Sequence, residues 1–213
     1  MDGVDVVIIG AGVVGCAVAQ ALSGRGLSAL LLESERQEGT GLTSRNSGVV
    51  HSGLYYAPGS LKARSCLEGQ RLLYEWCTGQ GVEVLRCGKL VVASSDEEVS
   101  ALKALHQHAL RCGAAAVQLV SRQEAIALEP RLASGPATQA LWCPDSGIVD
   151  AHGLTRSLRR EAQRGGVDVV FNGRVSSIEH LPGCWRITTA RGVVQGAMLV
   201  NAAGLAADVV ARM

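Results

Sequence analysis

The beginning of the chain combines apolar, β-branched runs with regularly spaced glycines. Residues 4–10 (VDVVIIG) have the composition of a strand that is buried on both faces. Residues 11–26 predict a helix with small residues on one side, which Gly24 and Gly26 end. Residues 27–33 (LSALLLE) predict a second buried strand. Together these segments predict a β-α-β unit.

The middle of the chain is polar and mixed in its pattern. After a Gly-rich stretch we expect a helix from Ser60, and residues 86–95 predict a strand. Ser95 and Ser121 are each followed three residues later by a glutamate, which is the capping-box pattern at a helix start. Residues 150–165 are amphipathic and predict another helix.

The last part of the chain is rich in strand patterns. Pairs of turn-forming residues separate the candidates, and a short helix is expected to begin after the last of them. The four strand candidates are residues 167–171, 174–179, 184–190 and 198–204.

Three glycines and one acid in the first β-α-β unit indicate the kind of ligand that it binds. Gly10, Gly12 and Gly15 form G-x-G-x-x-G directly after a strand and at the start of a helix. These glycines permit a tight turn, a close approach of a pyrophosphate and close helix–strand packing, while the helix N-terminus attracts the phosphates. Glu33 ends the second strand, where an acid binds ribose hydroxyls. The unit therefore predicts dinucleotide binding.

The order of the segments distinguishes between NAD and FAD. A Rossmann NAD enzyme would continue with further α/β units soon after Glu33. This chain instead inserts GTGLTSRNSGVVHSGLYY and a mixed region, and it returns to an apolar strand only at MLVNAAG. That layout favours a flavin domain interrupted by a substrate domain.

Several stretches resemble one family in order along the chain. DVVIIGAGVVG, TSRNSGVVHSGLYY, GSLKARSCLEGQ, SGIVDAHGL and LVNAAGLAAD are similar to FAD-dependent oxidoreductases of the D-amino-acid oxidase type. Within that type, NSGVVHSGLYY followed by SLKA most resembles L-2-hydroxyglutarate dehydrogenases and oxidases.

The resemblance implies an α/β fold with a Rossmann-like, glutathione-reductase-type FAD-binding domain and an inserted α+β substrate domain. The expected division is residues 1–80 for the first part of the FAD-binding domain, 81–150 for a substrate-domain segment and 151–213 for the return to the FAD-binding domain. Family members are considerably longer. The chain is therefore expected to be truncated at the C-terminus, without the rest of the substrate domain and a Gly-rich segment that closes over the flavin.

By resemblance, small residues and backbone groups line the cofactor. Arg45 either adds charge near the phosphates or is solvated. The expected FAD-binding residues are Gly10, Gly12, Val13, Val14, Gly15, Glu33, Thr43, Ser44, Asn46, Ser47, Gly48, His51, Val175, Ala203 and Gly204.

The expected catalytic residues are His51, Tyr56 and Lys89. For His51 four roles stay open: proton acceptor for a hydroxyl, flavin contact, covalent flavin link, or structural histidine. Histidine is in general a suitable base near neutral pH. Lys89 and the Tyr55–Tyr56 pair are candidates to anchor a dicarboxylate. The alternative for them is a surface lysine and tyrosines that pack at a domain boundary.

The implied function is FAD-dependent oxidation of a 2-hydroxy acid, with L-2-hydroxyglutarate as substrate and 2-oxoglutarate as product. A related enzyme that oxidises amines, amino acids or glycerol 3-phosphate is the alternative. A third possibility is a catalytically incomplete flavin-binding fragment. The electron acceptor, oxygen or a quinone, stays open.

Composition narrows the remaining classes. The net charge is +1 and only 3% of residues are aromatic, so no nucleic-acid partner is expected. Seven scattered cysteines without a C-x-x-C pair indicate free thiols in a reducing compartment and no zinc or other metal site. Residues 4–22 fit neither a signal peptide nor a membrane span. We expect a cytoplasmic protein without membrane association; a mitochondrial location stays open, although no transit peptide is visible.

Overall fold

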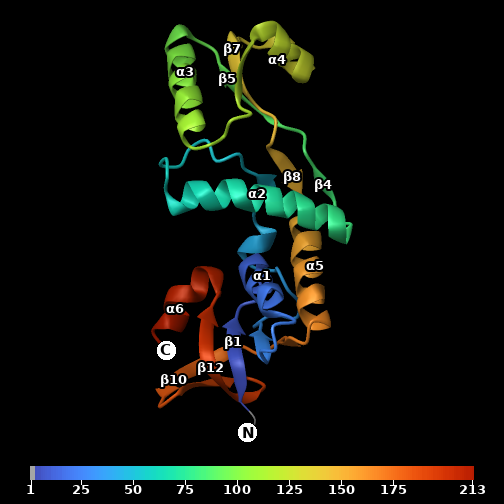
Figure 1. The fold of residues 1–213 in the computed structure, drawn as a ribbon, viewed down its shortest axis with the longest axis vertical. Coiled ribbons are helices and arrows are strands. Elements are labelled where there is room, and N and C mark those ends of the chain that lie inside the picture. Colours follow the sequence, from blue (N-terminus) through green and yellow to red (C-terminus); the bar gives the residue numbers. More distant parts are fainter. Residues whose placement is uncertain (1–2) are drawn as a thin grey trace. The chain divides into compact units, whose positions relative to one another are not determined.

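The computed structural model describes residues 3–213 and separates them into two compact units. Of the described residues, one unit comprises 3–46 and 150–213, the blue and the orange-to-red segments of Figure 1, and the other comprises Ser47–Val149. The first of these units is interrupted after Asn46, so α2 (Leu61–Gln80) belongs to the second unit. The expected division into residues 1–80, 81–150 and 151–213 stays a prediction. The roles assigned to these segments stay predictions.

The first unit is built on one six-stranded mixed sheet. The neighbouring strands β12 (Gly192–Asn201), β1 (Val4–Ile9), β2 (Ala29–Leu32) and β9 (Asp168–Val170) are parallel. Strands β10 (Val175–Leu181), β11 (Cys184–Thr189) and β12 form an antiparallel meander. This arrangement confirms the expected α/β class with a parallel sheet. The strand order is β10, β11, β12, β1, β2 and β9.

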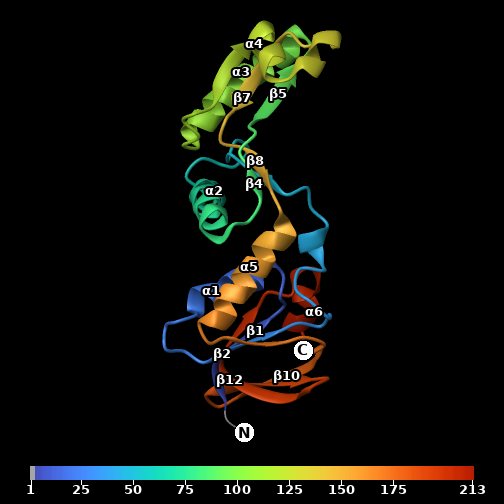
Figure 2. The same cartoon turned by 90° about the vertical axis from the view of Figure 1, so that its right-hand side faces the viewer.

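The sheet of the first unit is covered by helices. The apolar run of β1 lies centrally between β12 and β2, so its Val7 and Ile8 are fully buried. On one face Val7, Ile187 and Val210 join one apolar cluster. Helices α1 (Val13–Leu22) and α5 (Ala151–Arg164) pack against each other, as Figures 1 and 2 show. The remaining elements are two 3₁₀ turns, Leu42–Ser44 and Gly204–Ala206, and α6 (Ala207–Ala211).

The second unit contains two small sheets and three α-helices among its described residues. Sheet order is β5–β7–β6 and β3–β8–β4, and an apolar cluster around Leu54, Leu102 and Leu141 forms its core. Besides α2, the elements are β3 (Val49–Val50), β4 (Val84–Leu85), β5 (Lys89–Ala93), α3 (Asp96–Arg111), β6 (Gln118–Ser121), α4 (Arg122–Leu128), a 3₁₀ turn (Pro130–Ser134), β7 (Gln139–Cys143) and β8 (Gly147–Val149).

Local signals in the sequence locate the helix ends of this unit well. Ser95 Oγ accepts the Glu98 amide at 3.3 Å. Ser121 and Glu124 form a complete capping box before α4. The sequence did not predict the strands β3, β4, β6, β7 and β8, because each depends on pairing with another segment of the chain. In residues 3–213 no helix has the length and apolar character needed to cross a membrane.

Candidate functional site

The turn after β1 is shaped for close backbone approach. Gly10 has φ +102°, and a Cβ there would lie 2.5 Å from the carbonyl oxygen of Ala202. A Cβ at Gly15 would lie 1.8 Å from the carbonyl oxygen of Gly10. Because β1 and β12 are parallel neighbours, their carboxyl-end turns meet, and the Ala202 amide donates to Ile9 at 2.8 Å. Side chains are therefore excluded here, as dinucleotide-binding turns require.

The N-terminus of α1 has no side-chain cap of its own. Its N-cap residue is Gly12, and the Val13 amide donates to Thr43 Oγ1 at 3.0 Å. Thr43 is 9% exposed, and its Oγ1 lies 3.3 Å from the place a Cβ on Gly12 would take. Other first-turn amides of a helix have no partner within it and attract anions together with the helix dipole. The geometry suits a pyrophosphate.

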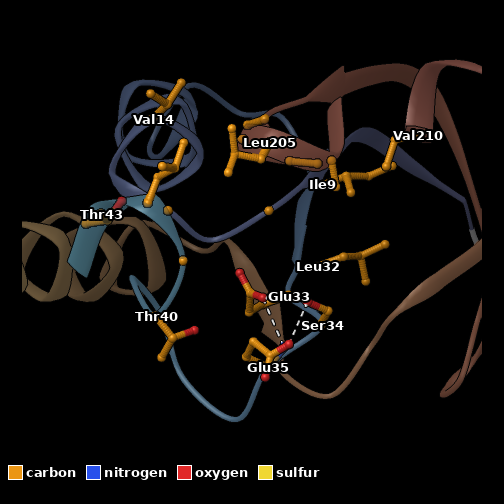
Figure 3. A pocket seen from close by; sticks show the side chains of 18 of the residues that line it. Ile9, Val14, Leu32, Glu33, Ser34, Glu35, Thr40, Thr43, Leu205 and Val210 are labelled. Atoms are coloured by element: carbon orange, nitrogen blue, oxygen red, sulfur yellow. Dashed lines mark hydrogen bonds between the residues drawn. The ribbon is translucent and has the colours of Figure 1, made fainter. Parts of the chain in front are cut away.

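Glu33 holds its carboxylate at the carboxyl end of β2. Its Oε2 accepts the Ala11 amide at 2.8 Å, and its Oε1 accepts the Glu35 amide at 3.0 Å. The same Oε1 accepts the Ser34 hydroxyl at 3.0 Å (Figure 3). Three donors fix an acceptor group whose remaining lone pairs suit the hydroxyls of a ribose.

The turn, the helix end and the acid share one pocket of about 670 Å³ in the first unit. In Figure 3, Val14 and Leu205 lie on one side and Glu33, Ser34 and Glu35 on another, with Ile9, Leu32 and Val210 forming an apolar wall. Ten of the expected cofactor residues line this pocket: Gly10, Gly12, Val13, Val14, Glu33, Thr43, Asn46, Val175, Ala203 and Gly204.

The other expected cofactor residues lie elsewhere. Gly15 and Ser44 belong to the first unit but not to the pocket lining; Ser44 Oγ donates to the carbonyls of Thr40 and Gly41 at 2.9 and 2.8 Å. Ser47, Gly48 and His51 belong to the second unit, with Tyr56 and Lys89. Their contact with a cofactor stays a prediction.

Sequence reasoning missed part of the pocket. Arg174 lines it and pairs with Glu35 at 3.6 Å, beside the Glu33 carboxylate. The turn before Arg174 is fastened to the end of β2, since the Gly173 amide donates to the Glu33 carbonyl at 2.8 Å. The Asn172-Gly173 pattern predicted this turn, but it did not indicate that the turn lies beside the end of β2. The apolar members Leu205, Val209 and Val210 follow the expected NAAG strand and carried no signal of their own.

The residue set fits an FAD dinucleotide. It combines a turn with glycines where the backbone approaches most closely, a helix N-terminus at the pocket, a fixed carboxylate and an apolar wall. Among residues 3–213 no group of three or more histidine, cysteine or acidic side chains is placed to hold a metal ion.

In the second unit, backbone carbonyls fix the expected catalytic segment. The His51 carbonyl accepts from Gln70 Nε2 at 2.9 Å. The Tyr56 carbonyl accepts from Cys112 Sγ at 3.0 Å and lies 2.8 Å from His108 Nε2. The sequence indicated only a surface or capping role for His108. In the structure His108 lies on α3 and contacts the backbone of Tyr56.

The expected substrate anchors contact each other within this unit. Lys89 Nζ lies 4.9 Å from the centre of the Tyr55 ring, and Lys62 Nζ lies 4.7 Å from the centre of the Tyr56 ring. These are cation–π distances. The sequence indicated that Lys62 is a solvated helix residue. In the structure it lies over a tyrosine ring, as the predicted anchor Lys89 does.

Comparison with protein families decides the family. A profile described as FAD dependent oxidoreductase (DAO) matches residues 5–213. The chain belongs to this family. FAD is the cofactor of the family, and its members are oxidoreductases, which agrees with the cofactor and fold class expected from the sequence.

Two similar proteins are named as L-2-hydroxyglutarate dehydrogenases. The chain is 40% identical to the human mitochondrial L-2-hydroxyglutarate dehydrogenase over 177 residues, which are 82% of the chain and 38% of that protein. It is 35% identical to L-2-hydroxyglutarate dehydrogenase of Indibacter alkaliphilus over 98% of the chain and 52% of that protein. The chain thus spans about two fifths to one half of these relatives.

Solved structures agree on the fold. An L-α-glycerophosphate oxidase from Mycoplasma pneumoniae with FAD bound superimposes with a TM-score of 0.87 and 26% identity, covering 95% of this chain and 54% of that one. L-proline dehydrogenase from P. horikoshii gives a TM-score of 0.90 at 22% identity, with 100% of this chain and 56% of that one covered. At that identity the second likeness concerns the fold alone.

Proposed function

We propose that this protein oxidises L-2-hydroxyglutarate to 2-oxoglutarate with FAD. The observation that carries the proposal is the 40% identity to the human L-2-hydroxyglutarate dehydrogenase over 82% of the chain. Bound FAD would accept a hydride from the carbon that bears the hydroxyl. The protein has to remove the hydroxyl proton, hold both carboxylates and exclude water.

The first unit would hold the cofactor. We assign the pyrophosphate to the turn at Gly10 and Gly12 and the α1 N-terminus, and the ribose to Glu33. Val175, Ala203 and Gly204 would contact the cofactor from the last strands. The support for this assignment is the shared pocket and the three donors that orient the Glu33 carboxylate.

The second unit would supply the substrate chemistry. We assign His51 as the group that accepts the hydroxyl proton, and Lys89 with Tyr56 as anchors for the carboxylates. Gln70, which donates to the His51 carbonyl at 2.9 Å, supports this assignment because it fixes the backbone of that residue. The Lys89–Tyr55 contact keeps an ammonium next to the same segment.

Oxidation of glycerol 3-phosphate is the second candidate. The chain is 32% identical to a glycerol 3-phosphate dehydrogenase of Caloramator mitchellensis over 98% of its length. Amine or amino-acid oxidation is a further alternative, as is a flavin-binding chain that needs additional sequence for turnover. We expect the protein to act away from the membrane, in the cytoplasm, whereas several relatives are named as mitochondrial.

One experiment distinguishes these functions. The protein is loaded with FAD, and each substrate is added without oxygen while the flavin absorbance is followed. Bleaching by L-2-hydroxyglutarate, with none by its D-enantiomer, supports the proposal. Bleaching by glycerol 3-phosphate or an amino acid instead assigns the alternative. An FAD-loaded protein that no substrate bleaches would identify the incomplete chain.

The role of His51 needs its own test. Acid precipitation of the holoprotein releases flavin into the supernatant if the cofactor is not covalently attached. Flavin that stays with the pellet of the parent protein, but not with the pellet of His51→Ala, would assign His51 as the attachment point and contradict its role as proton acceptor. Oxygen and quinones are then compared as oxidants of the reduced enzyme.

A further inference from the structure

Glu38 and Arg159 form an ion pair beside the pocket without lining it. Arg159 Nη2 lies 3.4 Å from Glu38 Oε1. The Arg159 side chain is 20% exposed and the Glu38 side chain is 12% exposed. Arg156 adds a longer contact of 4.0 Å to the same oxygen from a 62% exposed side chain. A pair shielded to this degree is screened less than a surface pair, so Arg159 is the main partner.

We propose that the Glu38–Arg159 pair is a positioning device that holds the loop carrying Thr43 against the phosphate-binding end of α1. The inference rests on the proposal that this pocket binds FAD. No family motif quoted above includes either residue. Arg159 comes from α5 and Glu38 from the loop after β2, so the pair joins two segments that are distant in sequence.

The residue after Glu38 transmits the constraint. The Gly39 amide donates to the Ala11 carbonyl at 2.9 Å, within the Gly-rich turn itself. Gly39 has φ +72°, and a Cβ there would lie 3.5 Å from the methyl groups of both Thr155 and Thr43. The loop is therefore held between α5 and the turn at the point where Glu38 is paired.

Thr43 is the part of this loop that reaches the helix end. Its Oγ1 accepts the Val13 amide at 3.0 Å. If the loop moves away, this amide loses its acceptor and the lining of the pocket changes at Thr43. The ion pair thus acts on the cofactor site through Gly39 and Thr43, as a supporting contact does.

The pair also includes an unsatisfied group. Arg159 Nε is buried without a hydrogen-bond partner in the described part of the chain. Removal of Glu38 would leave a shielded guanidinium with its main counter-charge gone, which costs more than the loss of an exposed ion pair. We therefore expect the loop to loosen when either partner is neutralised.

The test uses Glu38→Gln and Arg159→Met in the full chain. Arg164→Met is the matched control, because Arg164 lies on the same helix and pairs with Glu161 from a 70% exposed side chain. Two readouts are measured: hydrogen exchange of the Gly39 and Val13 amides without cofactor, and the Kd for FAD from quenching of its fluorescence. Exchange of the Ile8 amide, in the centre of the sheet, reports global unfolding.

Both variants are expected to exchange the Gly39 and Val13 amides faster and to bind FAD about tenfold more weakly, a factor that corresponds to about 1.4 kcal/mol. Arg159→Lys, which keeps the charge, should restore most of the affinity. Equal exchange and Kd in the variants and in Arg164→Met would overturn the inference, as would a change confined to Ile8. A parent protein that does not bind FAD would contradict the proposed function instead, while amide exchange still decides whether the pair holds the loop.

Discussion

Glu33 Oε2 accepts a 2.8 Å hydrogen bond from the backbone amide of Ala11, inside the Gly-rich turn. The acid at the end of β2 thus contacts the loop at the end of β1. One carboxylate therefore orients the turn and also presents acceptors to the pocket. This dual role makes the charge of Glu33 important for both the apoprotein and the cofactor.

Replacement of Glu33 by glutamine should weaken FAD binding by about tenfold or more, since hydrogen bonds to a charged group are stronger than neutral ones. Glutamine offers only one acceptor oxygen, and its amide would face donors from Ser34 or Ala11. Titration of FAD fluorescence measures the Kd. Glu179→Gln is the control, because Glu179 lies on β10 outside the pocket lining and pairs with Arg186 from a 57% exposed side chain. An equal loss in both variants would contradict the role of Glu33.

Gly10→Ala should destabilise the protein by at least about 2 kcal/mol, because it combines a positive φ with a steric clash. The added Cβ would lie 2.5 Å from the Ala202 carbonyl. Gly24→Ala is the control: Gly24 has φ +71° and nothing within 4 Å of the added atom, so it should cost only about 1–2 kcal/mol. Urea unfolding measures both free energies. Similar costs would show that the contact with Ala202 is unimportant.

Local patterns were sufficient for part of this site, and distant pairings explain the rest. The spacing of Gly10, Gly12 and Glu33 follows from one β-α-β unit, so the sequence predicted their place in the pocket. Arg174 reaches the same pocket because Leu32 pairs with Val170 across β2 and β9, which no local pattern reveals.

The pairing of the segment after Asn46 could not be predicted from the sequence for the same reason. The polar stretch after Asn46 has little regular pattern, yet Val49 and Val50 form a strand by pairing with β8 almost a hundred residues later. That pairing ties the stretch to the second unit. Short strands of this kind depend on their partner for stability, so a sequence pattern seldom identifies them.

Thr43→Val should remove the acceptor of the Val13 amide and keep the shape of the side chain. The bond is partly buried, so the loss of its acceptor should cost up to about 1–3 kcal/mol. Part of this cost should appear as weaker FAD binding, because the open helix end faces the pocket. Thr43→Ser keeps the hydroxyl and should retain the affinity of the parent protein. Calorimetry with FAD compares the three proteins, and a serine variant as weak as the valine variant would exclude the hydrogen bond as the cause.

Cys16, on the first turns of α1, gives a prediction for alkaline pH. Burial raises the pKa of its thiol from an ordinary value of 9.0 to about 12, and the Glu38 charge acts in the same direction. The folded protein therefore disfavours the thiolate, whereas the unfolded chain ionises near 9.0. The stability that this thiol contributes is complete below pH 9.0 and decreases as the pH rises from there toward about 12.

Cys16→Ala should accordingly lose less stability between pH 8 and pH 10.5 than the parent protein, by urea unfolding at each pH. Cys87→Ala, at an exposed thiol, is the control and should follow the parent curve. Parallel curves for the parent protein and Cys16→Ala would show that the Cys16 thiol titrates alike in both states.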